Sequence, residues 1–286
     1  MMNTSYDGLP PVSAFIEKYG LRAKKSLGQN FLCDLNLADR IARSVPEIAG
    51  SAVLEIGSGP AGLTRALLKN GAAKVLAVEF DGRAIGVLAE LREKYGGRLE
   101  ALEADALSLD YAELKRKHAA GLDFRICANL PYNISVPLLA KWIFADVADS
   151  MTLMFQREVA ARIAAPSRTK DYGRISIVAQ LTHRTRVLFG VNRNSFTPAP
   201  KVSSSLVELA RLSSRPEPGL LLKVAGLAKL AFSGRRKMLR GSLRPLFGDA
   251  AALEQTLSAA GIAPTMRAEE IPPEGFLRLA SLLPPP

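Results

Sequence analysis

Four consecutive residues, Asn129-Leu130-Pro131-Tyr132, bring together polar and aromatic groups suited to chemistry on a flat molecule. Asn129 offers its side-chain carbonyl as a hydrogen-bond acceptor. Pro131 favours extended backbone at Leu130, which directs the Leu130 carbonyl outward as a second acceptor. Tyr132 supplies an aromatic face on which a base can stack. The tetrapeptide therefore predicts a site for a base that carries an amino group, the alternative being an ordinary proline turn.

Such a site favours methyl transfer to the exocyclic nitrogen of the base. That nitrogen is a poor nucleophile because its lone pair is delocalised into the ring. Acceptors at Asn129 and Leu130 can draw its protons out of the ring plane and so localise the lone pair. In-line positioning against a methyl donor supplies much of the remaining acceleration. We expect no strong general base, since neither histidine of the chain, His118 or His183, is placed to act as one.

A nucleotide-type cofactor site is predicted by residues at three successive strand ends. Gly57, Gly59 and Gly62 fit the pattern G-x-G-x-x-G between a strand and a helix. Glu79 follows the next strand and can bind both hydroxyls of a ribose. On these features a nicotinamide dinucleotide and S-adenosylmethionine fit equally well. Asp105, after the third strand, can accept a hydrogen bond from an adenine amino group, or can cap the turn that follows. Together the three features predict an adenosine site.

A parallel sheet is needed to bring these residues together. The chain alternates apolar strand-like runs with helix-length segments, which is typical of βαβ units and a Rossmann-like sheet. Ligands bind outside the carboxyl ends of such strands, so the motifs above face one crevice. Two further β-rich runs, 186–191 and 204–209, are predicted to form a hairpin at the sheet edge. Strands are predicted at 52–56, 74–79, 99–103, 124–128 and 151–155, and helices at 36–45, 63–68, 84–95 and 136–144.

The character of the chain changes near residue 212. A stretch rich in Ser, Pro and Gly, 213–219, reads as a linker. Beyond it only helical patterns occur, at 220–232, 238–247, 250–261 and 273–283. We therefore predict an N-terminal arm over 1–23, a cofactor-binding domain over 24–211 and a small all-α domain over 212–286.

Composition narrows the class of protein. The chain has 38 Lys and Arg against 27 Asp and Glu, a net charge of +11, which fits a polyanionic partner such as nucleic acid, the equal alternative being a solvated basic surface. Two cysteines and two histidines, without paired spacing, predict neither a disulfide scaffold nor a metal site. No signal peptide and no membrane-spanning apolar run is found. We expect a cytoplasmic protein without metal.

The motifs together resemble the ribosomal RNA adenine dimethyltransferase family, and most closely its small-subunit (16S) branch. Lys24–Leu32 is similar to the family signature K-x-x-G-Q-N-F-L, and Ser195–Ser204 to F-x-P-x-P-K-V-x-S. Two tail segments, Arg235–Arg240 and Arg267–Ile271, match as well. This sequence departs from the family pattern at one position in the glycine loop, because many members have the third glycine at the position of Ala61. We expect a slight change of loop geometry there, with cofactor binding retained.

The resemblance implies a Rossmann-like class I S-adenosylmethionine-dependent methyltransferase sheet with a small all-α C-terminal domain. It implies S-adenosylmethionine as cofactor and S-adenosylhomocysteine as product, without a metal. The target adenine would be held by Asn129, Leu130, Pro131 and Tyr132, with Phe196 completing a sandwich around the base. Cofactor contacts are implied at Asn30, Leu32, Gly57, Gly59, Glu79, Asp105 and Asn129.

Clusters of basic residues predict where RNA binds. The segment 229–244 holds six basic residues and no acid, whereas a solvated helix face usually interleaves acids with bases. A second cluster, formed by Arg22, Lys24 and Lys25, lies directly before the implied cofactor contacts Asn30 and Leu32. The RNA-binding candidates are Arg22, Lys24, Lys25, Arg235, Arg236, Lys237 and Arg240.

By this resemblance we expect dimethylation of two adjacent adenosines in the 3′-terminal hairpin loop of 16S rRNA. The substrate would be the small (30S) subunit or its precursor, with a role in subunit biogenesis, and the enzyme a monomer that binds no membrane. Three alternatives stay open: a 23S rRNA adenine methyltransferase, a dinucleotide-dependent oxidoreductase, and an assembly factor for which methylation is secondary.

Overall fold

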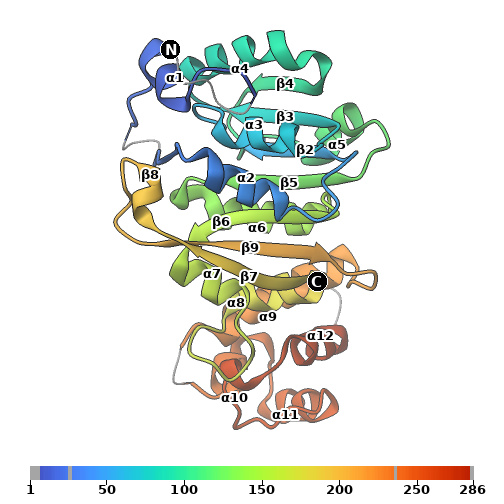
Figure 1. The fold of residues 1–286 in the computed structure, drawn as a ribbon. Helices are drawn as coiled ribbons and strands as arrows, with labels where there is room; N and C mark the ends of the chain where they lie inside the picture. The colour runs from blue at the N-terminus through green and yellow to red at the C-terminus, as the bar shows by residue number, and fades with distance from the viewer. Residues whose placement is uncertain (1–6, 25–27, 235–236, 284–286) are drawn as a thin grey trace. The chain divides into compact units, whose positions relative to one another are not determined.

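The computed structural model describes residues 7–24, 28–234 and 237–283. Within these ranges one mixed sheet has the strand order β4-β3-β2-β5-β6-β9-β7 (Figure 1). The first five strands in that order run parallel, and β9 runs antiparallel to β6. The strands are β2 (Ala52–Ile56), β3 (Lys74–Glu79), β4 (Leu99–Glu103), β5 (Phe124–Asn129), β6 (Ser150–Gln156), β7 (His183–Val191) and β9 (Ser204–Arg211).

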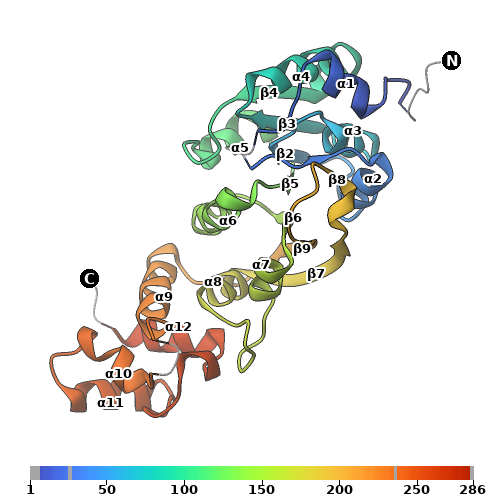
Figure 2. The same ribbon diagram turned by 90° about the vertical axis from the view of Figure 1, so that its left-hand side faces the viewer.

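The inner parallel strands β2, β3, β5 and β6 are largely buried because helices cover both faces of the sheet, whereas the edge strand β4 is partly exposed. All five residues of β2 are buried, including the carboxylic acid Glu55. Helices α2 (Leu35–Arg43) and α3 (Gly62–Lys69) lie on one face, and α5 (Tyr111–Ala119) and α6 (Tyr132–Ala145) on the other (Figure 2). Helix α4 (Gly82–Tyr95), followed by the 3₁₀ turn η2 (Gly96–Arg98), packs along β3 and β4.

Aspartates set where several of these helices begin. The side chain of Asp34 accepts hydrogen bonds from two backbone N–H groups at the start of α2, at 2.9 and 3.2 Å. Asp81 and Asp110 each accept one such hydrogen bond at the start of α4 and α5. Such caps satisfy N–H groups that the helix itself leaves without a partner. Because Asp81 stands two residues after the end of β3, the cap also keeps the β3–α4 connection short.

The stretch predicted as a polar arm contains a helix that belongs to the first unit. Helix α1 (Val12–Lys18) buries Val12 and Phe15, and Asp7 pairs at 2.6 Å with the fully buried Arg65 of α3. A buried guanidinium needs such a partner, since an unpaired buried charge is strongly destabilising. The helix is too short for its apolar spacing to show in the sequence, which explains the difference from the prediction.

A second, two-stranded sheet joins distant parts of the chain. Strand β1 (Phe31–Leu32) pairs antiparallel with β8 (Phe196–Thr197), so that Leu32 lies opposite Phe196. The 3₁₀ turn η3 (Arg193–Ser195) leads into β8. The two segments that the sequence singled out as signatures are therefore neighbours in space. Each strand has only two residues, too few for any strand pattern to predict it.

Contacts divide the chain into two compact units. The first contains residues up to 160 together with 187–210, and the second contains 161–186 and 211–286. The sequence prediction placed 161–186 in the first domain, yet helix α8 packs against α9 and α12. Tyr172 shows why, since its hydroxyl donates to the carbonyl of Ile271 at 2.8 Å and its ring lies against Phe232. The helices here are α7 (Arg157–Ile163), which spans the division, α8 (Arg174–Thr182), α9 (Pro218–Ala231), α10 (Leu239–Ser242), α11 (Ala250–Ala259) and α12 (Pro273–Leu282).

Two details of the predicted elements are confirmed and one is wrong. Strands β9 and β7 lie side by side at the sheet edge, as the hairpin prediction requires. The second unit is helical after residue 211, with 3₁₀ turns η4 (Arg244–Leu246) and η5 (Ala268–Glu270). The helix predicted over 238–247 is shorter, because α10 ends at Ser242 and Pro245 has no backbone N–H to continue an α-helix.

We expect Gly62→Ala to lower the free energy of unfolding by ~1–3 kcal/mol. A Cβ at this position would stand 2.8 Å from the backbone carbonyl oxygen of Leu32, and a strand backbone cannot move aside cheaply. Urea unfolding followed by the fluorescence of Trp142, the single tryptophan, measures the change. Gly97→Ala is the control, because a Cβ there meets nothing within 4 Å. Equal midpoints for the two variants would contradict the close approach of β1 to α3.

Candidate active site

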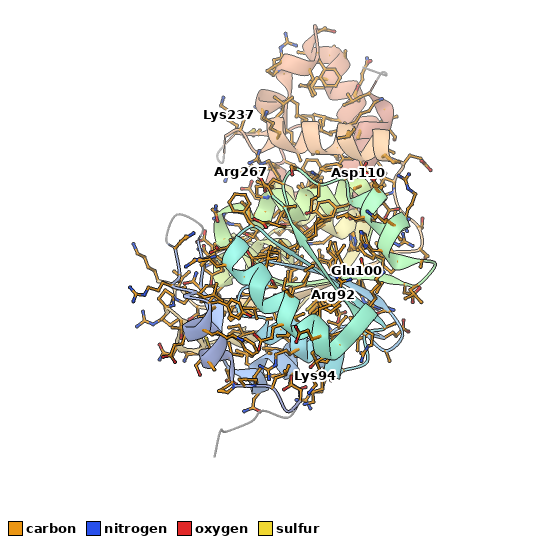
Figure 3. All side chains as sticks on the ribbon, turned by 90° about the horizontal axis from the view of Figure 1, so that it is seen from above. Arg92, Lys94, Glu100, Asp110, Lys237 and Arg267 are labelled. Carbon is orange, nitrogen blue, oxygen red and sulfur yellow. The ribbon has the colours of Figure 1, made fainter. Side chains whose placement is uncertain are left out.

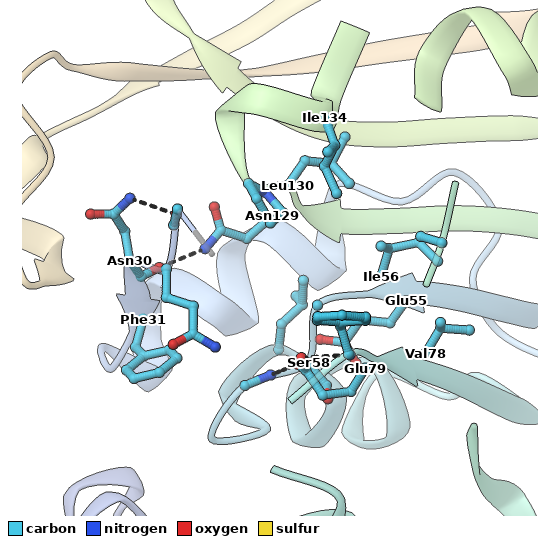
Figure 4. A pocket seen from close by; sticks show the side chains of 18 of the residues that line it. Asn30, Phe31, Glu55, Ile56, Ser58, Val78, Glu79, Asn129, Leu130 and Ile134 are labelled. Atoms are coloured by element: carbon cyan, nitrogen blue, oxygen red, sulfur yellow. Dashed lines mark hydrogen bonds between the residues drawn. The ribbon is translucent and has the colours of Figure 1, made fainter. Parts of the chain in front are cut away.

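A cavity of about 250 Å³ opens at the carboxyl ends of β2, β3 and β5 (Figure 4). The first unit supplies all its walls. Eleven residues singled out in the sequence line it: Asn30, Leu32, Gly57, Gly59, Gly62, Glu79, Asp105, Asn129, Leu130, Pro131 and Tyr132. Their convergence follows from the topology, because parallel strands end at one edge of the sheet.

Glu79 fixes the backbone around the floor of this cavity. Its Oε1 accepts the N–H groups of Phe80 and Asp81 at 2.8 and 2.9 Å, and its Oε2 accepts the N–H of Gly59 at 2.8 Å. A carboxylate has about four acceptor sites, so these three bonds leave about one for a ligand. Binding of both ribose hydroxyls by Glu79 therefore requires that the Gly59 bond be shared or released.

The loop after β2 has the backbone that its glycines permit. Gly57 and Gly59 have φ angles of 74° and 50°, in the left-handed region. Ala61 is also left-handed, with φ 62°, at a cost of roughly 1 kcal/mol for a residue with a Cβ. The adjacent Gly62 has no positive φ. Ala61 thus adopts a backbone conformation that glycine would adopt without this energetic cost.

Asp105 has the turn-capping role considered for it, and its contact with an adenine amino group stays a prediction. Its Oδ1 accepts the N–H of Leu107 at 2.9 Å, which caps the turn after β4. The residue also lines the cavity and is exposed. One carboxylate oxygen is thus occupied by the turn, and the other remains as an acceptor at the cavity wall.

Asn129 is held by the N-terminal signature. Its amide nitrogen donates to the backbone carbonyl of Asn30 at 3.1 Å, and the amide of Asn30 donates to the carbonyl of Gly28 at 3.2 Å (Figure 4). Since the nitrogen of Asn129 is committed to this bond, its Oδ1 is the atom left to accept a proton donor. These two hydrogen bonds therefore fix the side chain of Asn129, with its Oδ1 as an available acceptor.

The ring of Tyr132 is anchored through its hydroxyl group. Its hydroxyl lies 2.6 Å from Oγ of Ser204, and partial burial raises the pKa of the phenol above its usual value. The ring is consequently a neutral, fixed face at the cavity.

Leu130 is buried at 2% exposure. Phe196 does not line the cavity: it is 3% exposed and packs in the core opposite Leu32. Its implied contact with the target base stays a prediction.

The structure adds cavity residues that the sequence reasoning missed. Phe80 follows Glu79 and is 61% exposed at the cavity, an unusual position for an aromatic side chain. Ser58 is 6% exposed, and its Oγ has no hydrogen-bond partner among the described residues. Gln29 bridges from the N-terminal signature to Asp81 at 3.1 Å. The position of Phe80, directly after the acid that ends β3, could have indicated from the sequence that it lines the cavity. Nothing in the sequence indicated this for Ser58.

Glu55 is the most perturbed group in the cavity wall. It is 1% exposed, and the hydroxyl of Thr64 donates to its Oε2 at 2.6 Å. Burial raises the pKa of Glu55 to about 8, the hydrogen bond from Thr64 opposes the shift, and the charge of Glu79 adds to it. The carboxyl is thus largely protonated near neutral pH.

This set of groups fits an adenosine-containing ligand. The exposed face of Phe80 suits a flat ring, Glu79 and Asp105 supply acceptors for hydroxyl and amino donors, and the unpartnered Ser58 hydroxyl can meet a further polar group. Across the described parts of the chain, no group of three or more His, Cys, Asp or Glu side chains could hold a metal ion. In these same parts, no helix is long and apolar enough to span a membrane.

The predicted RNA-binding residues fall into two places. Arg22 and Lys24 are exposed in the first unit, where Lys24 lies 3.8 Å from the carboxylate of Asp81. Lys237 and Arg240 are exposed in the second unit. The remaining candidates, Lys25, Arg235 and Arg236, lie outside the described residues.

Comparisons with known proteins agree with these features. Residues 20–284 match the family described as ribosomal RNA adenine dimethylase. The chain is 49% identical over 276 residues to ribosomal RNA small subunit methyltransferase A of Paramagnetospirillum magneticum, covering 96% of this chain and 95% of that protein.

Solved structures agree with the fold. A dimethyladenosine transferase from Plasmodium falciparum superposes with a TM-score of 0.73 at 27% identity, over 86% of this chain and 94% of that one. The 23S rRNA methyltransferase ErmE has a TM-score of 0.64 at 28% identity, over 89% of this chain and 99% of that one. The sheet is thus that of the class I methyltransferases.

We expect the stability of the protein to fall with rising pH because of Glu55, and Glu55→Gln to remove this fall. The pKa of Glu55 in the folded state, about 8, exceeds its ordinary value of 4.5. Between these values the folded state binds more protons than the unfolded state, so the free energy of unfolding decreases by at most ~1.4 kcal/mol per pH unit. Glutamine cannot ionise and lacks this dependence. Urea unfolding across this pH window measures both; identical slopes would contradict the assignment.

Proposed function

Because the chain belongs to the ribosomal RNA adenine dimethylase family, whose enzymes use S-adenosylmethionine, we propose that it dimethylates two adjacent adenosines of 16S rRNA. The proposed target is the 3′-terminal hairpin loop, within the small subunit or its precursor, and the methyl groups go to the exocyclic nitrogens. We further propose that the enzyme acts as a monomer in the cytoplasm and takes part in subunit biogenesis. The carrying observation is the hydrogen bond of Asn129 to Asn30, which orients an acceptor at the cavity.

In this proposal, some residues of the cavity bind the cofactor and others bind the target base. S-adenosylmethionine supplies an electrophilic methyl group on a sulfonium. We assign Glu79 and Gly59 to the ribose, Asp105 to the adenine amino group, and Asn30 and Leu32 to the remainder of the cofactor. All of them line the same cavity. Gly57 leaves room for close approach of the ligand to the backbone.

The acceptors next to the strand end act on the target. Oδ1 of Asn129 and the carbonyl of Leu130 would accept the two protons of the adenine amino group, while the ring of Tyr132 stacks on the base. The amino nitrogen then presents its lone pair toward the methyl donor. Proximity and orientation supply most of the acceleration in this scheme, and no general base has to reach the nitrogen.

A small-subunit substrate is supported over a large-subunit one by the closeness of the relatives. The chain is 49% identical in sequence to the protein named for the small subunit and 28% identical to the one named for 23S rRNA. An oxidoreductase is disfavoured because the chain belongs to a methyltransferase family.

RNA contact in the second unit is supported by a strip of basic side chains. Residues 238 and 267 form an antiparallel bridge, and the N–H of Arg240 donates to the carbonyl of Pro264 at 3.2 Å. This pairing places Lys237, Arg240 and Arg267 close to one another, all of them exposed; Figure 3 labels Lys237 and Arg267. We propose that this basic strip binds backbone phosphates.

We expect Asn129→Ala to lower methyl transfer by about 100-fold or more, the loss typical of removing a positioned hydrogen-bonding group. The assay supplies small subunits that lack the modification with radiolabelled S-adenosylmethionine and separates the nucleosides by chromatography. Asn36→Ala, an exposed asparagine of α2, is the matched control. A wild-type protein that yields no dimethyladenosine would refute the proposed activity, and so would full transfer to naked 23S rRNA alone.

We expect Arg240→Ala to weaken RNA binding and to reduce the slope of log affinity against log salt by about one. A neutral residue releases no counterion at the position of one phosphate contact. Filter binding of small subunits over a series of salt concentrations gives the slope. Arg92→Ala, on the exposed side of α4 in the first unit, is the control (Figure 3). An unchanged slope for Arg240→Ala would remove that residue from the binding surface.

A further inference from the structure

The proposed function leaves one sequence signature without a role. The segment F-x-P-x-P-K-V-x-S begins at Phe196, which packs in the core rather than in the cavity. It ends at Ser204, the first residue of β9, which is 1% exposed. A buried hydroxyl needs a hydrogen-bond partner. The partner of Ser204 is the hydroxyl of Tyr132, at 2.6 Å.

The sheet explains how the two residues meet. In the register of β5 and β6, Asn129 lies opposite Met154, and in the register of β6 and β9, Gln156 lies opposite Ser204. Tyr132 stands three residues after Asn129, at the start of α6. Its side chain therefore extends past the end of β6 to reach β9. This connection links the strand that carries the acceptor to a strand two places away in the sheet.

The hydrogen bond restricts the position of the ring. A tyrosine at the first position of a helix has more than one staggered χ1 value, and only contacts select among them. Tyr132 is half-buried, so packing alone does not enclose it. An anchored hydroxyl sets where the far end of the ring lies. A base stacked on this ring would thereby have a defined plane relative to Oδ1 of Asn129.

We propose that Ser204 is a positioning residue for methyl transfer, holding Tyr132 as a fixed face for the target adenine. Ser204 acts through Tyr132 and does not touch the substrate. This inference rests on the proposed function, because it takes the base that stacks on Tyr132 to be the adenine. It gives the C-terminal end of the signature a task, while Phe196 and its strand hold the N-terminal signature through β1.

A double-mutant cycle tests the inference in single-turnover methyl transfer to unmodified small subunits. We expect Ser204→Ala and Tyr132→Phe each to lower the rate by about 10-fold, a loss in the range caused by misplacing a reacting group. The double variant should lose no more than either single variant, because all three lack the same hydrogen bond. Losses that multiply to about 100-fold in the double variant would overturn the proposal, as would a Ser204→Ala rate within two-fold of the wild type.

A second measurement follows the base itself. With 2-aminopurine in place of the target adenine, stacking on Tyr132 quenches the fluorescence, and we expect Ser204→Ala to quench less. Affinity for S-adenosylhomocysteine should be unchanged in the variant, which separates loss of orientation from a damaged cavity. Ser205→Ala is the matched control, since Ser205 is the next residue of β9 and is also buried. A control that loses as much activity as Ser204→Ala would contradict the specific role.

The outcomes separate this inference from the proposed function. If the wild type forms no dimethyladenosine, the proposed function has failed. If the wild type is active, Asn129→Ala is inactive and Ser204→Ala retains the full rate, only the positioning role has failed. Should Ser204→Ala not fold, Tyr132→Phe removes the same bond from the other side and decides the matter.

Discussion

The carboxylate of Glu79 is the interaction on which the site depends. It accepts three backbone N–H groups, one from the glycine loop after β2 and two from the turn after β3. Those groups would otherwise have no partner at a strand end that must stay open for a ligand, and unsatisfied buried N–H groups are costly. One side chain thereby fixes two loops. The cavity can be preformed because its floor does not rely on the ligand for hydrogen bonds.

Around that floor, two functional side chains are oriented by residues from distant parts of the chain. Asn129 is turned by the carbonyl of Asn30, and Tyr132 is anchored by Ser204. Preorganisation of this kind matters for a reaction that depends on geometry more than on acid–base catalysis. Glu55 and the left-handed Ala61 are the energetic costs: a carboxyl kept protonated by burial, and a strained residue in the loop.

The sequence was sufficient for the parts of the fold that repeat a local pattern. Strands β2, β3 and β4 begin and end where predicted, because each is a short run rich in apolar residues between helix-length segments. The cavity residues followed from the same logic, since strand ends meet at one edge. Other parts could not be predicted. The β1–β8 pair and the packing of 161–186 with the C-terminal helices depend on contacts between remote segments, which leave no periodicity in the sequence.

In the proposed reaction, Asn129 and Tyr132 stand beside the transferable methyl group of a cofactor bound in the Glu79 cavity. A crystal structure with S-adenosylhomocysteine tests it most directly. We expect the ribose to contact Glu79, the adenine amino group to lie within hydrogen-bond distance of Asp105, and the sulfur to face Oδ1 of Asn129. A ligand bound in the opposite sense, with its sulfur away from Asn129 and Tyr132, would contradict it.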